Sequence, residues 1–211
     1  MENQIYKIYI DKGSLSFFDA KNYQNIGDSS LCINFYDFIE DSAEQILKNK
    51  TYRSKNILIV CQNLEQDYQK FIKLFEPVFA AGGIVENEFH EILFIQRNKK
   101  WDLPKGHIEL NELAIEGALR EVREECGLQE LTLLSQKPLL LLAHIYFEHD
   151  RTPAVKYTSW YPMKASKNSP TQPQKEEGIT AIEWIGSPYH KVLKSRTYSS
   201  IIDIVNLLLG A

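Results

Sequence analysis

Some segments of residues 1–76 alternate apolar and polar positions as strands do, and others repeat apolar positions at helical spacing. The pattern predicts a small unit that contains both strands and helices. Ile5–Ile10 alternates as a strand with one buried face does, and Ser14–Phe18 follows the turn at Lys12–Gly13 as the second arm of a hairpin. The other elements predicted here are a strand over Leu31–Phe35, a helix over Ser42–Lys50 capped by Asp41, a buried strand over Asn56–Val60 and a helix over Asn63–Phe75. Pro77 interrupts the last helical pattern, so we place a boundary near Glu76–Pro77 and expect the two parts to pack together.

The second part, residues 77–211, has the pattern of a sheet with one long helix. Its predicted strands are Val78–Val85, Glu91–Gln96, Leu139–Phe147, Val155–Pro162 and Ile179–Ile185. Proline and glycine predict irregular structure over Trp101–Asn111 and a loop over Lys164–Gly178. We expect Asn111 to cap a helix over Glu112–Cys126 that ends at Gly127, and an amphipathic helix to cover Tyr198–Leu209.

The composition is typical of a globular protein with one large domain, or with one medium domain and a smaller companion. The 211 residues are 44% hydrophobic and 25% charged, with a formal net charge of −4. This mild acidity gives no reason to expect a nucleic-acid or anionic-membrane partner. The three cysteines, Cys32, Cys61 and Cys126, form no CxxC pair, which argues against a disulfide framework or a zinc site and suits a reducing cytosol.

We expect a cytoplasmic location and no membrane partner. The N-terminal stretch MENQIYKIYIDKG has an early acid and no apolar run long enough for a signal peptide. The run LLLLA at residues 139–143 is far shorter than the roughly 20 apolar residues that cross a bilayer.

Three carboxylates are crowded into one turn of the predicted helix. Glu121, Glu124 and Glu125 stand at positions i, i+3 and i+4, so their side chains project from one face. Like charges at this spacing repel each other by a few tenths of a kcal/mol per pair in water, and by more when they are buried. A divalent cation relieves this repulsion, and clustered hard oxygen ligands suit Mg²⁺ or Mn²⁺.

An acidic triple on a helix is most often a solvated face, but the surrounding residues argue for a metal site. The stretch fits the pattern G-x5-E-x7-R-E-U-x-E-E-x-G-U, in which U is a bulky aliphatic residue. The fixed positions are filled by Gly106, Glu112, Arg120, Glu121, Val122, Glu124, Glu125, Gly127 and Leu128. This is the pattern of the Nudix box, and from about Val78 to Ala211 the chain resembles the Nudix hydrolase superfamily.

The resemblance implies a fold and a metal site. The expected fold class is α/β: a Nudix-type α/β/α sandwich with a mixed β-sheet over residues 77–211, plus a small N-terminal α/β extension of unknown role over residues 1–76. In the family the box glutamates hold divalent cations, which implies that role for Glu121, Glu124 and Glu125, with the carbonyl oxygen of Gly106 as a further ligand.

Two further box residues support this cluster in the family. By resemblance, Arg120 orients a carboxylate through an ion pair, and Glu112 supports the cluster or helps to position water. The plainer alternatives are that Arg120 only pairs along the helix with Glu116 or Glu124, and that Glu112 only favours the helix N-terminus.

The sequence leaves two roles with more than one candidate. One is the acid that accepts the proton of water, and the other is the acid that completes the metal site. Nudix enzymes differ in the base they use, so Glu125 and Glu121 are both candidates. A further acid often follows the box in a loop. Glu176 and Glu177 lie before a predicted strand and are candidates, with Glu177 as the metal ligand, although a solvated loop explains them equally well.

The residues just before the box suggest how phosphates are bound. The stretch Trp101–His107 reads WDLPKGH, with Lys105 where many Nudix proteins have glycine, and resembles the subgroup that hydrolyses diadenosine and diphosphoinositol polyphosphates. Lys105 can meet an extra phosphate as a mobile point charge, and Arg97 at the end of a strand is a similar candidate. Ordinary surface charge is the alternative for both.

Aromatic residues offer candidates for stacking on a nucleobase. Trp101, Tyr146 and Tyr157 are named for this role, against the alternative that aromatic residues in strands are usually core. The predicted partner is a small nucleoside diphosphate derivative. A long nucleic acid is not expected, because no basic stripe is present, and a homodimer is kept as one option.

The sequence therefore predicts a Mg²⁺- or Mn²⁺-dependent pyrophosphohydrolase. It would cleave a nucleoside diphosphate linked to another moiety, such as a dinucleoside polyphosphate, by attack of a metal-activated water on phosphorus. The main alternative is a Nudix-fold protein that binds a nucleotide without cleaving it, and an isomerase acting on a diphosphate is a third reading. The native substrate is not predicted.

Overall fold

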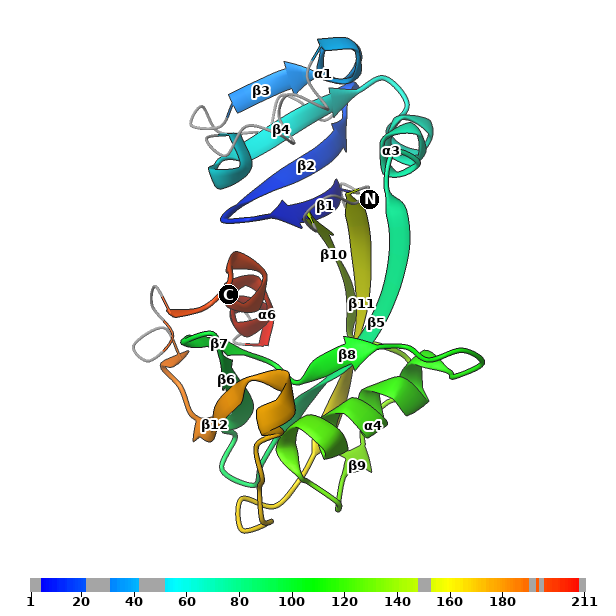
Figure 1. Cartoon of the computed structure of the whole chain (residues 1–211). Coiled ribbons are helices and arrows are strands. Elements are labelled where there is room, and N and C mark those ends of the chain that lie inside the picture. Colours follow the sequence, from blue (N-terminus) through cyan, green and yellow to red (C-terminus); the bar gives the residue numbers. More distant parts are fainter. Residues whose placement is uncertain are drawn as a thin grey trace. The chain divides into compact units, whose positions relative to one another are not determined.

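The computed structural model describes residues 5–21, 31–41, 52–147, 153–189, 193 and 196–208 (Figure 1). The chain divides into two compact units: unit 1 is Met1–Val78 with Ala143–Lys156, and unit 2 is Phe79–Leu142 with Tyr157–Ala211. The first division lies close to the predicted boundary at Glu76–Pro77. Unit 1 also includes Ala143–Lys156, which lie in the C-terminal part of the division predicted from the sequence. Local patterns do not show which strands pair over a long distance along the chain.

Unit 1 is a small sheet with helices that follow its strands. Strands β1 (Ile5–Ile10) and β2 (Gly13–Asp19) form the predicted hairpin, and β4 (Asn56–Cys61) pairs in parallel with both β2 and β3 (Leu31–Asn34). The segment Ala143–Ile145 of β10 (Leu140–Tyr146) pairs in parallel with β1. The sheet therefore contains both parallel and antiparallel pairs.

The helices of unit 1 begin where its parallel strands end. Helix α1 (Phe35–Asp41) starts directly after β3, where the sequence pattern predicts no helix. The short η2 (Tyr52–Ser54) precedes β4. Helix α3 (Leu64–Ile72) begins at the N-cap Asn63, whose side chain accepts a hydrogen bond from the Gln66 amide at 3.1 Å, and it is three residues shorter than predicted at its C-terminal end. The helix predicted over residues 42–50 lies outside the described residues.

Within the described residues, the sheet of unit 2 has helices packed on both of its faces, which confirms the predicted α/β/α sandwich. Strand β6 (Ile92–Arg97) shows this directly, because alternate side chains of a strand point to opposite faces. Leu93 and Ile95 pack with α4 (Ala114–Cys126), whereas Ile92 and Phe94 pack with α6 (Ser199–Leu208). Other strands with residues in unit 2 are β5 (Glu76–Glu86), β9 (Thr132–Leu133), β10, β11 (Ala154–Lys164) and β12 (Ile179–Ile185).

The segment predicted to be irregular contains two short strands. Asn98 and Lys99 have positive φ angles of 54° and 61°, and they form a two-residue turn that folds β7 (Lys100–Asp102) back on β6. Strand β8 (Lys105–His107) then pairs with β5. Pro104 lies between the two strands. It therefore separates β7 from β8, and it does not keep the whole segment irregular. The predicted loop Lys164–Gly178 likewise contains a short helix, η3 (Lys175–Glu177).

Helix α4 begins later than predicted and ends as predicted. Its N-cap is Leu113, not Asn111, which has a positive φ of 67° two residues earlier. The Glu116 carboxylate accepts the Leu113 amide at 3.0 Å, so no polar cap side chain is required. At the other end Gly127 has φ 72°, and its amide donates to the Arg123 carbonyl at 2.8 Å. Within the described ranges, no helix combines the length and apolar character needed to cross a membrane.

Candidate active site

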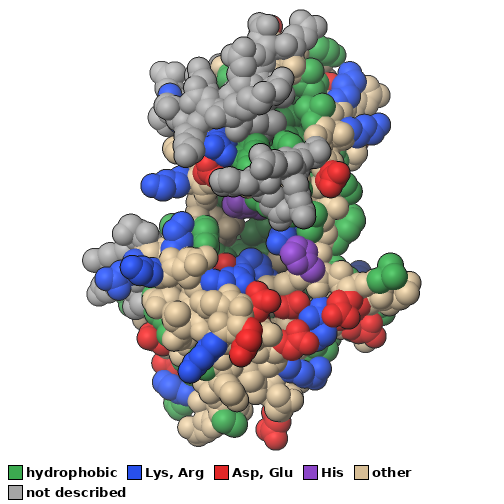
Figure 2. Space-filling model, viewed as in Figure 1, with side chains coloured by type: hydrophobic (Ala, Val, Ile, Leu, Met, Phe, Trp, Pro, Cys, Tyr) green, Lys and Arg blue, Asp and Glu red, His purple; other side chains and the backbone are tan. Residues whose placement is uncertain are grey.

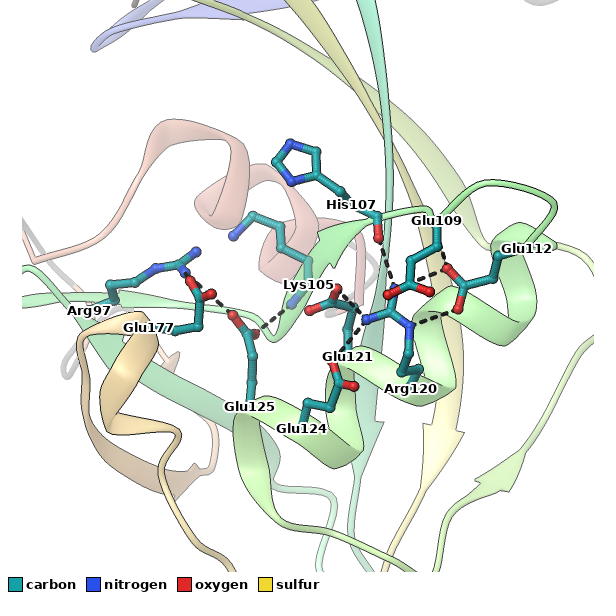
Figure 3. Close-up of polar contacts among 10 residues, drawn as sticks. All are labelled: Arg97, Lys105, His107, Glu109, Glu112, Arg120, Glu121, Glu124, Glu125 and Glu177. Carbon is teal, nitrogen blue, oxygen red and sulfur yellow. Dashed lines mark hydrogen bonds and ion pairs between the residues drawn. The ribbon is translucent and has the colours of Figure 1, made fainter.

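The guanidinium group of Arg120 binds three of the box carboxylates (Figure 3). Its Nε and Nη2 atoms donate to the two oxygens of Glu112 at 2.7 and 2.9 Å. Its Nη1 atom donates to Glu121 and to Glu124, both at 2.8 Å, and Nη2 also reaches the carbonyl of His107 at 2.9 Å. These contacts raise the pKa of Arg120, and its hydrogen bonds hold the pKa of Glu112 below the ordinary value. Arg120 thus fixes the positions of these carboxylates, and it is not limited to pairing along its own helix.

Glu125 is the buried member of the cluster. Its side chain is 2% exposed and lies where α4 packs against the strands. One oxygen accepts the backbone amide of Lys105 at 2.8 Å, and the other contacts Nη1 of Arg97 at 3.4 Å. Burial raises the pKa of Glu125 to about 7, although the charges of Lys105 and Arg97 oppose the change. Burial also raises the pKa of Glu121.

A side chain at position 106 would meet the Glu121 carboxylate, which would then have to shift. A Cβ atom built at Gly106 would lie 2.1 Å from the carboxylate carbon and oxygens of Glu121. Gly106 is held there by β8, in which it pairs with Ala81 of β5. The glycine of the box therefore lets the backbone of β8 approach a carboxylate of α4.

Arg97 links the cluster to the loop before β12. Its Nη1 atom lies 3.6 Å from Glu177, whose side chain is 58% exposed, as well as 3.4 Å from Glu125. Glu177 also contributes to the raised pKa of Glu121, so it lies within electrostatic range of the cluster. Of the two loop acids that the sequence proposed, Glu177 is the one that the structure places against Arg97; Glu176 is exposed on η3.

The ammonium group of Lys105 is paired with Asp102. Nζ lies 2.5 Å from Oδ2 of Asp102 and 5.9 Å from the ring centre of Trp160. Figure 3 shows the Lys105 side chain extending away from the carboxylates of Glu121 and Glu125, while its backbone amide faces Glu125. Asp102 was not named as a site residue, although the spacing of an acid and a lysine three residues apart in WDLPK was a usable signal.

The donor set fits a hard divalent cation. Glu121, Glu124 and Glu125 supply only carboxylate oxygens from one helix turn, and Gly106 allows the close approach of Glu121. In the part of the chain that the structure describes, no three acidic, histidine or cysteine side chains converge closely enough to form a metal-binding group. The hydrogen bonds explain this arrangement, because Arg120 draws Glu121 and Glu124 to one side while Glu125 contacts Arg97 and the Lys105 amide.

The sequence profile described as "NUDIX domain" matches residues 76–197, which is more than half of the chain. The chain belongs to the NUDIX domain family. The match covers strands β5 to β12, the box and α4, and it confirms the prediction of an enzyme of the Nudix hydrolase class, which acts on phosphoric anhydride bonds.

Known proteins similar to this Nudix chain include a curated relative and solved structures. "Phosphatase NudJ" of Shigella boydii serotype 4 is 27% identical over 130 residues, which cover 60% of this chain and 78% of that protein. A NUDIX family hydrolase from Clostridium perfringens is 20% identical with a TM-score of 0.48, covering 64% of this chain and 98% of that one. The Ap4A hydrolase of C. elegans is 18% identical with a TM-score of 0.46, covering 62% and 96%.

The aromatic residues named for base stacking have packing partners of their own. Trp101 is 5% exposed and packs in the core between the sheet and α6, so its faces are covered. The structure therefore does not support the stacking role predicted for Trp101. Tyr146 belongs to unit 1, where the Lys156 ammonium lies 5.3 Å from its ring centre. Tyr157 stacks on Phe79, with 5.9 Å between the ring centres.

Proposed function

We propose that this Nudix hydrolase is a divalent-cation-dependent pyrophosphohydrolase that cleaves a nucleoside diphosphate linked to another moiety. The observation that carries the proposal is the arrangement around α4: Glu125 is buried with a pKa near 7, and Arg120 holds Glu112, Glu121 and Glu124. Buried carboxylates with raised pKa values are costly in a merely structural helix and are frequent in active sites. The similarity to a protein named as a phosphatase agrees with this class of reaction.

The proposed ligands of Mg²⁺ or Mn²⁺ are Glu121, Glu124, Glu125, Glu177 and the carbonyl oxygen of Gly106. When bound, the cation neutralises the diphosphate oxygens and makes a bound water more acidic. Arg120 keeps the carboxylates of Glu121 and Glu124 in place through its ion pairs, and Glu112 in turn holds Arg120.

Side chains of the site take part in the attack of water on phosphorus and in the proton transfer that goes with it. Water forms the new bond to phosphorus, the anhydride oxygen leaves with the electron pair of the bond that breaks, and Glu125 or Glu121 takes the proton of the water. Arg97 and Lys105 supply positive charge for the substrate phosphates. A dinucleoside polyphosphate is the substrate class we favour, because the stretch WDLPKGH, with Lys105 before the box glycine, resembles the subgroup that hydrolyses such compounds. A cytoplasmic location stays a prediction.

A panel of nucleoside diphosphate derivatives with Mg²⁺ or Mn²⁺ and phosphate detection tests this function. We expect turnover of at least one member, and loss of it in Glu124→Gln, on the order of several kcal/mol of transition-state stabilisation. The variant should fold normally, because the Glu124 side chain is 47% exposed. Full activity of Glu124→Gln would contradict the metal assignment. Tight binding of nucleotides without turnover of any would favour a sensor.

A further inference from the structure

Asp102 holds the Lys105 ammonium in a fixed place beside the candidate site. Asp102 is 6% exposed and stands at the end of β7, in register with Ile95 of β6. Its Oδ1 atom accepts the Leu103 amide at 2.8 Å, and its Oδ2 atom accepts the Lys105 ammonium at 2.5 Å. The carboxylate is thus anchored by the sheet and by a backbone hydrogen bond, and the ammonium is the group that it restrains.

The Lys105 ammonium is also within range of the carboxylate cluster. The backbone amide of the same residue donates to Glu125 at 2.8 Å, so the flexible lysine stem begins at the cluster itself. The Lys105 charge acts on Glu125, since it is the main influence opposing the raised pKa of that carboxyl. An ammonium on a four-carbon stem moves easily among carboxylates. The Lys105 ammonium would therefore form ion pairs with Glu121 and Glu125 if nothing held it elsewhere.

We infer that Asp102 is a positioning residue, which keeps the Lys105 ammonium out of the carboxylate cluster so that it does not compete with a divalent cation there. The inference rests on the proposed function, because it assumes that Glu121 and Glu125 bind the cation. The Trp160 ring, 5.9 Å from Nζ, forms a second side of the place where the ammonium is held. In this position the Lys105 ammonium is a charge separate from the proposed metal ligands.

The test is Mn²⁺ binding without substrate, measured by calorimetry and by the paramagnetic resonance signal of free Mn²⁺. Asp102→Asn retains an oxygen for the Leu103 amide but loses the charge that holds the ammonium. We expect its Mn²⁺ affinity to fall about tenfold, since a hydrogen bond between charged groups that Mn²⁺ must break is worth at least one factor of ten. Lys105→Met in the same chain should remove this loss. Glu91→Gln breaks another acid–lysine pair of unit 2, with Lys167 at 2.7 Å, and is the matched control that should leave the affinity unchanged.

The outcomes separate the inference from the proposed function. No Mn²⁺ binding by the wild-type chain would contradict the proposed function itself. Binding by the wild type and equal binding by Asp102→Asn would overturn only the inference, and so would a loss that persists when Lys105 is methionine, since Asp102 would then act through the fold. If Asp102→Asn does not fold, Lys105→Met alone decides: unchanged affinity supports the inference, whereas clearly tighter binding would show that the ammonium already occupies the cluster.

Discussion

Replacing Glu125 by glutamine should make the metal-free protein more stable at pH 8 while it abolishes hydrolysis. Burial gives Glu125 a pKa of about 7 in the folded chain, against an ordinary value of 4.5. Between these two values the folded state binds more protons than the unfolded state. The free energy of unfolding therefore falls as the pH rises through this window, and the contribution of the protonated carboxyl is fully lost above about pH 7.

The size of the effect follows from the two pKa values. Each pH unit of difference corresponds to about 1.4 kcal/mol, so ionised Glu125 costs the fold about 3 kcal/mol at pH 8. Glutamine has the shape of the protonated acid, and its oxygen can still accept the Lys105 amide. Glu125→Gln should therefore match the wild type near pH 4 and exceed it by about 3 kcal/mol at pH 8, or by about 6–12 °C in Tm.

Urea unfolding followed by tryptophan fluorescence, in EDTA between pH 4 and pH 8, measures this difference. All three tryptophans, Trp101, Trp160 and Trp184, lie in unit 2, so the signal reports on the unit that contains Glu125. Glu124→Gln, at a side chain that is 47% exposed, is the matched control and should keep the wild-type dependence on pH. Adding Mn²⁺ should then stabilise the wild type more than Glu125→Gln. A stability difference that does not change with pH, or a less stable Glu125→Gln at pH 8, would refute the reasoning.

Three other substitutions test the rest of the site. Gly106→Ala places a Cβ atom 2.1 Å from the Glu121 carboxylate and should lower kcat/KM on the order of 10²-fold by displacing it, whereas Gly186→Ala, with its nearest contact at 3.4 Å, should leave kinetics unchanged. Arg120→Lys keeps the charge but loses the planar fork, so activity should fall about 10- to 100-fold with circular dichroism unchanged; wild-type kinetics would count against the role of the fork. Glu177→Gln should weaken Mn²⁺ binding about 10- to 100-fold, as expected for a ligand, and equal Mn²⁺ titrations would remove Glu177 from the site.

The core of unit 2 was predictable because it follows regular periods. Ala118, Val122 and Cys126 are fully buried at helical spacing on one side of α4, and Gly127 ends the helix as the sequence predicts. The box spacing also identified Glu112, Glu121 and Glu124, which the structure brings together at Arg120. Local pattern was sufficient here, since the residues lie on one helix and the loop before it.

The contacts around Lys105 were not predictable in the same way. Pro104 predicts an interruption of regular structure. Strands β7 and β8 on either side of it form only because they pair with β6 and β5, which are more distant in the sequence. Whether the Lys105 ammonium faces solvent, a phosphate or Asp102 depends on this hairpin. Trp101 shows the same limit, because its burial against α6 depends on a helix about 100 residues later.

Some residues of α4 depart from what a stable helix favours, which is an apolar buried face and charged side chains in solvent. These are the residues that the proposed chemistry uses. Elsewhere the helix obeys those rules, with an apolar side against the sheet and a glycine at its end. Glu125 instead buries an ionisable group that destabilises the metal-free protein at neutral pH, and Glu121 lies where a side chain of residue 106 would be. A helix selected for stability alone would have an apolar residue at position 125 and no need of glycine at position 106. The cost of both features therefore argues that the carboxylates are kept for what they bind.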